Sequence, residues 1–161
     1  MIVIGIDPGI ERTGIGIVEN IRGKSNLIFS ELIKTNSKLS TSERLAIIFQ
    51  TLNRITDLYK IDSASVEKLF FAKNTKTAMV VSEARGVLLL SLQLKNIPIY
   101  EYTPLQVKQA LTGYGSGTKE QVHNLVKIIL NLKDLSKQDD VSDGIALAIT
   151  HIHSQKCHGR S

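Results

Sequence analysis

The chain has 161 residues and a mass of 17.8 kDa, enough for one ordinary domain with a real core but not for two. Hydrophobic residues make up 42% and charged residues 22%, which is a globular rather than a disordered composition. The net charge of +5 suits a polyanionic partner without identifying one. A single cysteine, Cys157, excludes an intrachain disulfide and favours a reducing compartment. We expect no signal peptide and no membrane span, and hence a cytoplasmic protein.

Three strands are predicted in the first 35 residues, at Ile2–Ile6, Thr13–Val18 and Leu27–Thr35. Asp7-Pro8-Gly9 forms a turn after the first strand, and residues 22–26 turn the chain into the third. Because no helix intervenes, the pattern predicts an antiparallel meander.

Helices alternate with strands along the rest of the chain. Ser40 with Glu43, and Thr118 with Gln121, form capping-box patterns that each open a helix. The predicted elements are a helix from Ser40 to Tyr59, a strand at Ser63–Glu67, a helix from Asn74 to about Lys95 with Ala78, Val81, Leu88 and Leu92 facing inward, a strand at Ile97–Glu101, a short helix opened by Pro104, a helix from Thr118 to about Leu132, and a last helix from about Asp140 to His153. This order predicts one α/β domain with a mixed sheet over residues 1–155, and a short basic tail at 156–161.

Four carboxylates stand at the ends of these elements. Asp7 ends the first strand, Glu67 ends a small apolar strand, and Asp140 and Asp143 lie three residues apart on one face of the last helix. Each has an ordinary alternative: a turn aspartate for Asp7, an ion pair with Lys68 for Glu67, and helix N-terminal acids that favour the macrodipole for the pair.

Taken together, the four carboxylates predict an oxygen-only site that suits Mg²⁺ or Mn²⁺ and not zinc. Two such ions about 3.5–4 Å apart can cleave a phosphodiester bond. With four of the fifteen acids gathered in one pocket, eleven acids against twenty basic residues leave +9 on the rest of the molecule. A basic surface around an acidic pocket is what a nuclease needs.

Other side chains are weaker candidates. Lys108 and Lys119 are candidate phosphate contacts, Lys119 because it follows a glycine-rich loop at a helix start, although both also fit ordinary surface lysines. Phe70 follows Glu67 and is a candidate for stacking on an unpaired base, with core packing as the alternative. Four residues near the C-terminus could be considered as zinc ligands, but they lack the spacing of a zinc finger: His151, His153, Cys157 and His158.

Four motifs resemble those of the bacterial RuvC family of crossover junction endodeoxyribonucleases, and the resemblance covers nearly the whole chain. The motifs are Gly5-Ile6-Asp7-Pro8-Gly9 with Thr13-Gly14, residues 66–74 from Val66-Glu67 to Lys73-Asn74, Glu83-Ala84-Arg85-Gly86, and residues 140–146 from Asp140 to Ala146. The resemblance implies a ribonuclease H-like fold, a five-stranded mixed sheet flanked by helices. It also implies a homodimer that contacts through the long helix, depends on two Mg²⁺ ions with Mn²⁺ as a substitute, and resolves four-way Holliday junctions beside a branch-migration motor complex.

By position, the resemblance makes Asp7, Glu67, Asp140 and Asp143 the metal-binding catalytic acids. Lys119 matches a basic residue of phosphate contact and catalysis, Lys108 a phosphate contact, and Phe70 an aromatic residue that contacts bases near the junction centre.

Three other classes remain as alternatives. A catalytically silent junction-binding module would lack one of the acids, and none is missing. A shorter YqgF-type nuclease accounts less well for Phe70 and for the Asp140–Asp143 helix. A sugar-kinase or actin-like ATPase shares the Gly-Ile-Asp-Pro-Gly opening but needs two such domains.

Overall fold

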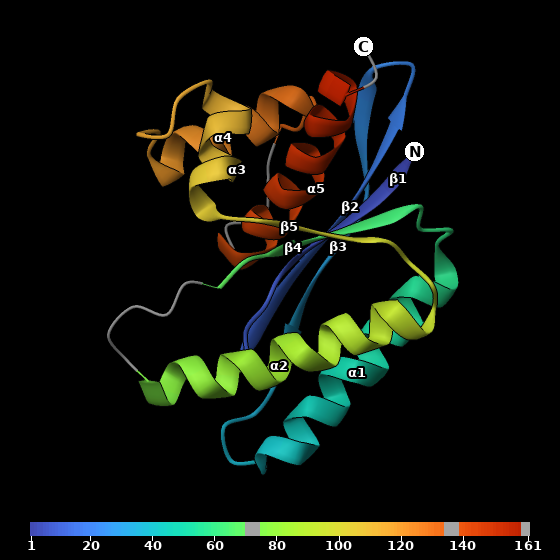
Figure 1. Ribbon diagram of the computed structural model, residues 1–161, viewed down its shortest axis with the longest axis vertical. Coiled ribbons are helices and arrows are strands. Elements are labelled where there is room, and N and C mark those ends of the chain that lie inside the picture. The colour runs from blue at the N-terminus through green and yellow to red at the C-terminus, as the bar shows by residue number, and fades with distance from the viewer. Residues whose placement is uncertain (70–74, 134–138, 159–161) are drawn as a thin grey trace.

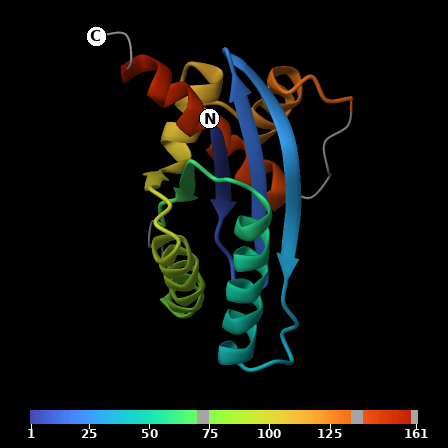
Figure 2. The same ribbon diagram turned by 90° about the vertical axis from the view of Figure 1, so that its right-hand side faces the viewer.

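The sheet of this protein lies between two groups of helices (Figures 1 and 2). The computed structural model describes residues 1–69, 75–133 and 139–158. The strands are β1 (Ile2–Asp7), β2 (Arg12–Ile21), β3 (Lys24–Lys34), β4 (Ser63–Glu67) and β5 (Ile99–Tyr102). The helices are α1 (Thr41–Leu58), α2 (Thr75–Leu94), α3 (Pro104–Thr112), α4 (Lys119–Ile129) and α5 (Asp139–His158). Helices α1 and α2 cover one face of the sheet, and α3, α4 and α5 cover the other (Figure 1).

The strand order is β3-β2-β1-β4-β5, and the sheet is mixed as predicted. β1, β2 and β3 form the expected antiparallel meander, whereas β4 pairs in parallel with both β1 and β5. The meander strands are longer than predicted because the turn between β2 and β3 takes only Arg22 and Gly23, whose φ angles are 50° and 90°. Positive φ angles at both central residues are typical of the tightest hairpin turns, so residues 24–26 already belong to β3.

The two predicted capping boxes are present. The Ser40 and Thr118 hydroxyls accept hydrogen bonds from the backbone N–H groups of Glu43 and Gln121, and the Glu43 and Gln121 side chains accept from the cap backbones. Helix α5 continues past the predicted end at His153 to His158, because no glycine or proline occurs between Ile145 and His158 to stop it.

Helix α2 differs in part from its predicted inward face. Leu88 and Leu92 are fully buried, together with Ala84, but Ala78 and Val81 are only half-buried. The described residues in the N-terminal half of α2 are therefore less buried by the rest of the chain than the inward face of an amphipathic core helix normally is.

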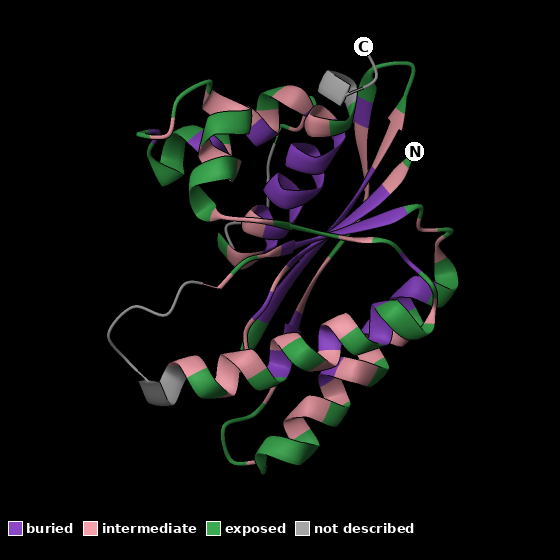
Figure 3. Cartoon of the chain, in the orientation of Figure 1, coloured by how far each residue is buried: buried purple, intermediate pink, exposed green. Residues whose placement is uncertain are grey.

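Alternation along the strands divides the core into two layers. Ile4 and Ile6 of β1 pack against α1 and α2, whereas Val3 packs against α5. Because side chains alternate between faces of a strand, Gly5 and Asp7 share the α5 face with Val3. The buried residues of β1 and of α5 meet at the centre of the molecule (Figure 3).

Across the described ranges, every helix is too short or too polar to cross a membrane.

Candidate active site

Asp7 and Glu67 come together because β1 and β4 are parallel neighbours. Ile6 pairs with Val66, so the next residue of each strand stands at the same carboxyl edge of the sheet. Ser65, two residues before Glu67, donates a hydrogen bond of 2.8 Å to the Leu147 carbonyl of α5. Glu67 therefore faces α5, as Asp7 does.

Two glycines let α5 approach this edge at backbone contact distance. A Cβ atom on Gly5 would overlap the Gly144 carbonyl oxygen, and one on Gly14 would overlap the Asp140 carbonyl oxygen. Any larger residue would hold the start of α5 away from the sheet. The glycines thus bring Asp140 and Asp143 up to Asp7.

The pKa of Asp7 is affected by the other three carboxylates of the predicted set. Burial, a side-chain hydrogen bond with Glu67, and the negative charges of Glu67, Asp143 and Asp140 raise the pKa of Asp7 to about 9. The protonated Asp7 carboxyl is then the hydrogen-bond donor to Glu67. All four predicted acids therefore contribute to one electrostatic site.

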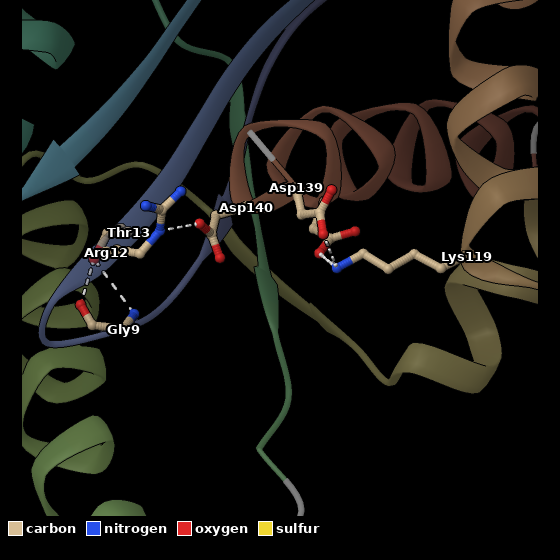
Figure 4. Close-up of polar contacts among 7 residues, drawn as sticks. Gly9, Arg12, Thr13, Lys119, Asp139 and Asp140 are labelled. Atoms are coloured by element: carbon tan, nitrogen blue, oxygen red, sulfur yellow. Dashed lines mark hydrogen bonds and ion pairs between the residues drawn. The ribbon is translucent and has the colours of Figure 1, made fainter. Parts of the chain in front are cut away.

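Two basic side chains contact the acids of α5 (Figure 4). Arg12 Nε donates to Asp140 Oδ2 at 2.5 Å. Lys119 Nζ lies 3.0 Å from Asp143 Oδ2 and 3.6 Å from Asp139 Oδ2. Each carboxylate of the Asp140–Asp143 pair thus has its own cation.

The pKa values of Lys119 and Asp143 reflect this pair. Partial burial lowers the pKa of Lys119, but the hydrogen bond and charge of Asp143 and the charge of Asp139 outweigh it, so the net shift is upward. Burial raises the pKa of Asp143, Lys119 opposes that shift, and the charges of Asp139 and Asp140 add to it. Lys119 is therefore charged. It contacts the carboxyl of Asp143, whose pKa is raised by burial.

Lys108 lines a cavity together with two of the four acids. This cavity of about 210 Å³ is bounded by Glu67, Asp143, Lys108 and Lys119, with Val107 among its apolar lining residues. The structure thus places both predicted lysines within reach of a ligand at the carboxylates.

Arg85 of α2 supports the end of β4. Its Nε donates to the Glu67 carbonyl oxygen at 3.3 Å, and its guanidinium is ion-paired with Glu101 of β5. Arg85 thus links the backbone of Glu67 to the next strand, which restrains the place where the Glu67 side chain starts.

Sequence reasoning missed Arg12 and the contact of Asp139 with Lys119. Nothing in the sequence around Arg12 indicates a partner 128 residues away, apart from its place beside the Thr13-Gly14 motif. Phe70 lies outside the described residues. His151 contacts the Tyr102 hydroxyl through Nδ1 at 2.8 Å and belongs to a hydrogen-bonded contact between α5 and β5.

The chemical type of these side chains suits a divalent cation. Three carboxylates, Glu67, Asp140 and Asp143, act on the half-buried Asp7, and carboxylate oxygens are the ligands that Mg²⁺ and Mn²⁺ prefer. Burial and neighbouring negative charges raise the pKa of Asp7, and a cation there would offset the charges. In the part of the chain that the structure describes, no three His, Cys, Asp or Glu side chains already converge closely enough to hold a metal ion. Asp140 and Asp143 instead contact Arg12 and Lys119.

Comparisons with known proteins agree with this architecture. Residues 3–151 match the family model "Crossover junction endodeoxyribonuclease RuvC". A protein of that name from Alkaliphilus metalliredigens is 49% identical over 154 residues, which cover 96% of this chain and 94% of the relative. The solved structure of Thermus thermophilus RuvC has a TM-score of 0.90 at 33% identity, covering 98% of this chain and 97% of that one. The same protein in complex with a Holliday junction substrate gives 0.90 at 32% identity, covering 98% and 96%.

The fold and the carboxylate edge define a nuclease of the ribonuclease H-like class. Within that class, the extent of these matches is decisive, and the chain belongs to the RuvC family of crossover junction endodeoxyribonucleases.

Proposed function

We propose that this protein resolves Holliday junctions by two symmetric nicks in strands of like polarity, in homologous recombination and DNA repair. The observation that carries the proposal is the electrostatic coupling of Asp7 to Glu67, Asp140 and Asp143 at one sheet edge, with basic side chains beside the two acids of α5. The solved complex of the T. thermophilus relative contains a Holliday junction substrate, which supports the choice of DNA structure.

The four acids are proposed to hold two Mg²⁺ ions, for which Mn²⁺ can substitute. Ions held there would supply activation of the attacking water and stabilisation of the departing 3′-oxygen, and the products would carry 5′-phosphate and 3′-hydroxyl ends. Lys119 and Lys108 are positioned to attract the phosphate into the cavity that they share with Glu67 and Asp143. Lys119 also touches Asp143, so it is placed to act in catalysis as well as in binding.

A homodimer is the proposed active form, because paired nicks need two sites. Helix α2 supports this through exposed apolar side chains: Met79, Leu90 and Leu94 are more than half exposed. Leu89, Leu90 and Ile99 line a cavity between α2 and β5 that a second copy can fill. We also propose a branch-migration motor complex as partner and a cytoplasmic location, for which only the family membership argues.

Phe70 is proposed to stack on a base near the junction centre. In that case, Phe70→Ala impairs cutting of an intact junction more than cutting of a nicked one, because a nicked junction already exposes its bases. Equal effects on the two substrates would indicate that Phe70 packs in the protein core and does not contact bases.

The experiment that tests the function is a nicking assay on an immobile four-way junction beside a linear duplex of the same sequence, with Mg²⁺ and with EDTA. Paired, metal-dependent nicks on the junction alone are expected. Equal cutting of the duplex would indicate a general ribonuclease H-like nuclease. Tight junction binding without any cutting would indicate a silent binding module.

A further inference from the structure

Arg12 is held against Asp140 by a fixed turn. The buried Thr13 hydroxyl donates to the Gly9 carbonyl at 2.6 Å and accepts from the Gly9 N–H at 3.3 Å (Figure 4). These two bonds close the segment between β1 and β2 and place Arg12 at the start of β2. Its Nε then reaches Asp140 Oδ2 at 2.5 Å, with the two side chains 45% and 29% exposed.

This contact occupies an oxygen that the proposed metal site needs. Asp140 raises the pKa of Asp7 through its charge, so it belongs to the electrostatic group around Asp7. A carboxylate oxygen that accepts a charge-assisted hydrogen bond is a weaker ligand, because its lone pairs and its charge are shared with the guanidinium.

The contact also lowers the repulsion in the metal-free protein. Asp7, Glu67, Asp140 and Asp143 crowd one edge, and neighbouring carboxylates destabilise one another unless a proton or a cation intervenes. Lys119 meets Asp143 from α4, and Arg12 meets Asp140 from β2. The two cations therefore stand on opposite flanks of the acids.

We propose that Arg12 is a positioning residue which neutralises Asp140 in the metal-free protein and which a divalent ion must displace. Arg12 thereby stabilises the carboxylate edge before an ion binds, and raises the metal concentration that binding requires. The inference rests on the proposed metal site. It means that Arg12 competes with the ion for Asp140, whereas a residue that orients Asp140 would favour binding of the ion.

The test compares Mn²⁺ binding and stability in the full-length protein without DNA, so that no cleavage intervenes. Arg12→Gln removes the charge, and Arg12→Lys keeps it. Arg54→Gln is the matched control, because Arg54 makes a similarly exposed ion pair with Glu31 at 2.7 Å on the other face of the sheet. Asp7→Asn serves as the control for the metal site itself. Affinity is measured by titration calorimetry, and stability by thermal unfolding with and without saturating Mn²⁺.

Arg12→Gln is expected to bind Mn²⁺ about three- to tenfold more tightly than wild type, a range typical of a partly exposed charge-assisted pair. Its unfolding temperature should fall below that of wild type without Mn²⁺ and match it at saturation, because ligand binding and stability are linked. Arg12→Lys should stay near wild type. Arg54→Gln should leave the affinity unchanged and lower the unfolding temperature equally in both conditions.

Three results would overturn the inference. Unchanged affinity in Arg12→Gln, with equal loss of stability in both conditions, would make Arg12 an ordinary ion pair. Weaker binding would mean that Arg12 orients Asp140 for the ion. If wild type and Asp7→Asn both fail to bind Mn²⁺, the proposed metal site fails as well, and the inference falls with it.

Discussion

At the scale of single residues, the site depends on the balance between four carboxylates and their few cations. With a pKa raised to about 9 by burial and by Glu67, Asp7 carries a proton at neutral pH in the metal-free protein. Asp140 and Asp143 contact Arg12 and Lys119, so each acid of α5 has a cation beside it. Substitutions here should therefore separate binding, catalysis and stability from one another.

Asp7→Asn should abolish cleavage while junction binding persists. Asparagine has nearly the shape of a protonated aspartate, so metal-free stability should be unchanged or slightly raised, whereas the charge that a metal needs is lost. Nicking assays, gel shifts and urea unfolding provide the three readouts. Cleavage by this variant at the wild-type rate would refute the role of Asp7 as a metal ligand.

Lys119→Ala should slow cleavage by at least tenfold while weakening junction binding only a fewfold, because Lys119 contacts Asp143 beside the proposed reaction centre. Single-turnover rates and dissociation constants separate the two effects. Lys127→Ala, two turns further along α4, serves as the control and should change neither strongly. If rate and affinity fell by equal factors, Lys119 would be an ordinary phosphate contact.

At the scale of elements, the decisive contact is the packing of α5 on β1 and β2. Gly14→Ala should lower the free energy of unfolding by about 1–3 kcal/mol or more, because the new Cβ meets the backbone of Asp140 and must push α5 outward. Urea unfolding measures this loss. Gly86→Ala, where a Cβ meets nothing within 4 Å, is the control. Equal stability of the two variants would show that α5 can shift freely.

The contact between α5 and β5 should be sensitive to pH. His151 lies buried against Tyr102, and burial lowers the pKa of its imidazole below the usual 6.5. The unfolded chain therefore binds this proton at a higher pH than the folded chain does. The stability that neutral His151 preserves is complete above about pH 7 and declines as the pH falls through about 6.5 toward the folded-state pKa.

Urea unfolding of wild type and of His151→Asn at about pH 7.5 and about pH 5.5 isolates this effect from other titrating groups. Wild type should lose more stability than the variant between the two values. Parallel losses in both proteins would remove His151 as the cause.

At the scale of the whole molecule, the charge distribution governs DNA binding. The net charge of +5 includes the acids of the carboxylate edge, so the remaining surface is more basic than the total indicates. Junction affinity measured with EDTA should fall about tenfold between 50 and 200 mM salt for every two phosphates contacted, because bound counterions are released. Salt-independent affinity would contradict an electrostatic interface.

Much of this architecture could be predicted from the sequence. Hydrophobic periodicity and the Ser40 and Thr118 caps are local signals, so they predicted the strands, most helices and the capping boxes. The positions of Asp7 and Glu67 at strand ends, and the three-residue spacing of Asp140 and Asp143 on one helix face, predicted a carboxylate site, and in the fold the charges of the other three acids act on Asp7.

The rest was decided by contacts between distant residues. The sequence showed Gly14 only as part of the Thr13-Gly14 motif, whereas in the fold it is where α5 touches the sheet. The pairing of Arg12 with Asp140 joins residues 128 positions apart, and the pKa of Asp7 depends on burial and on three charges from β4 and α5. Local patterns determine where polar groups stand along each element, but only the packed sheet and helix determine which of them become neighbours, and electrostatic energy depends on that distance.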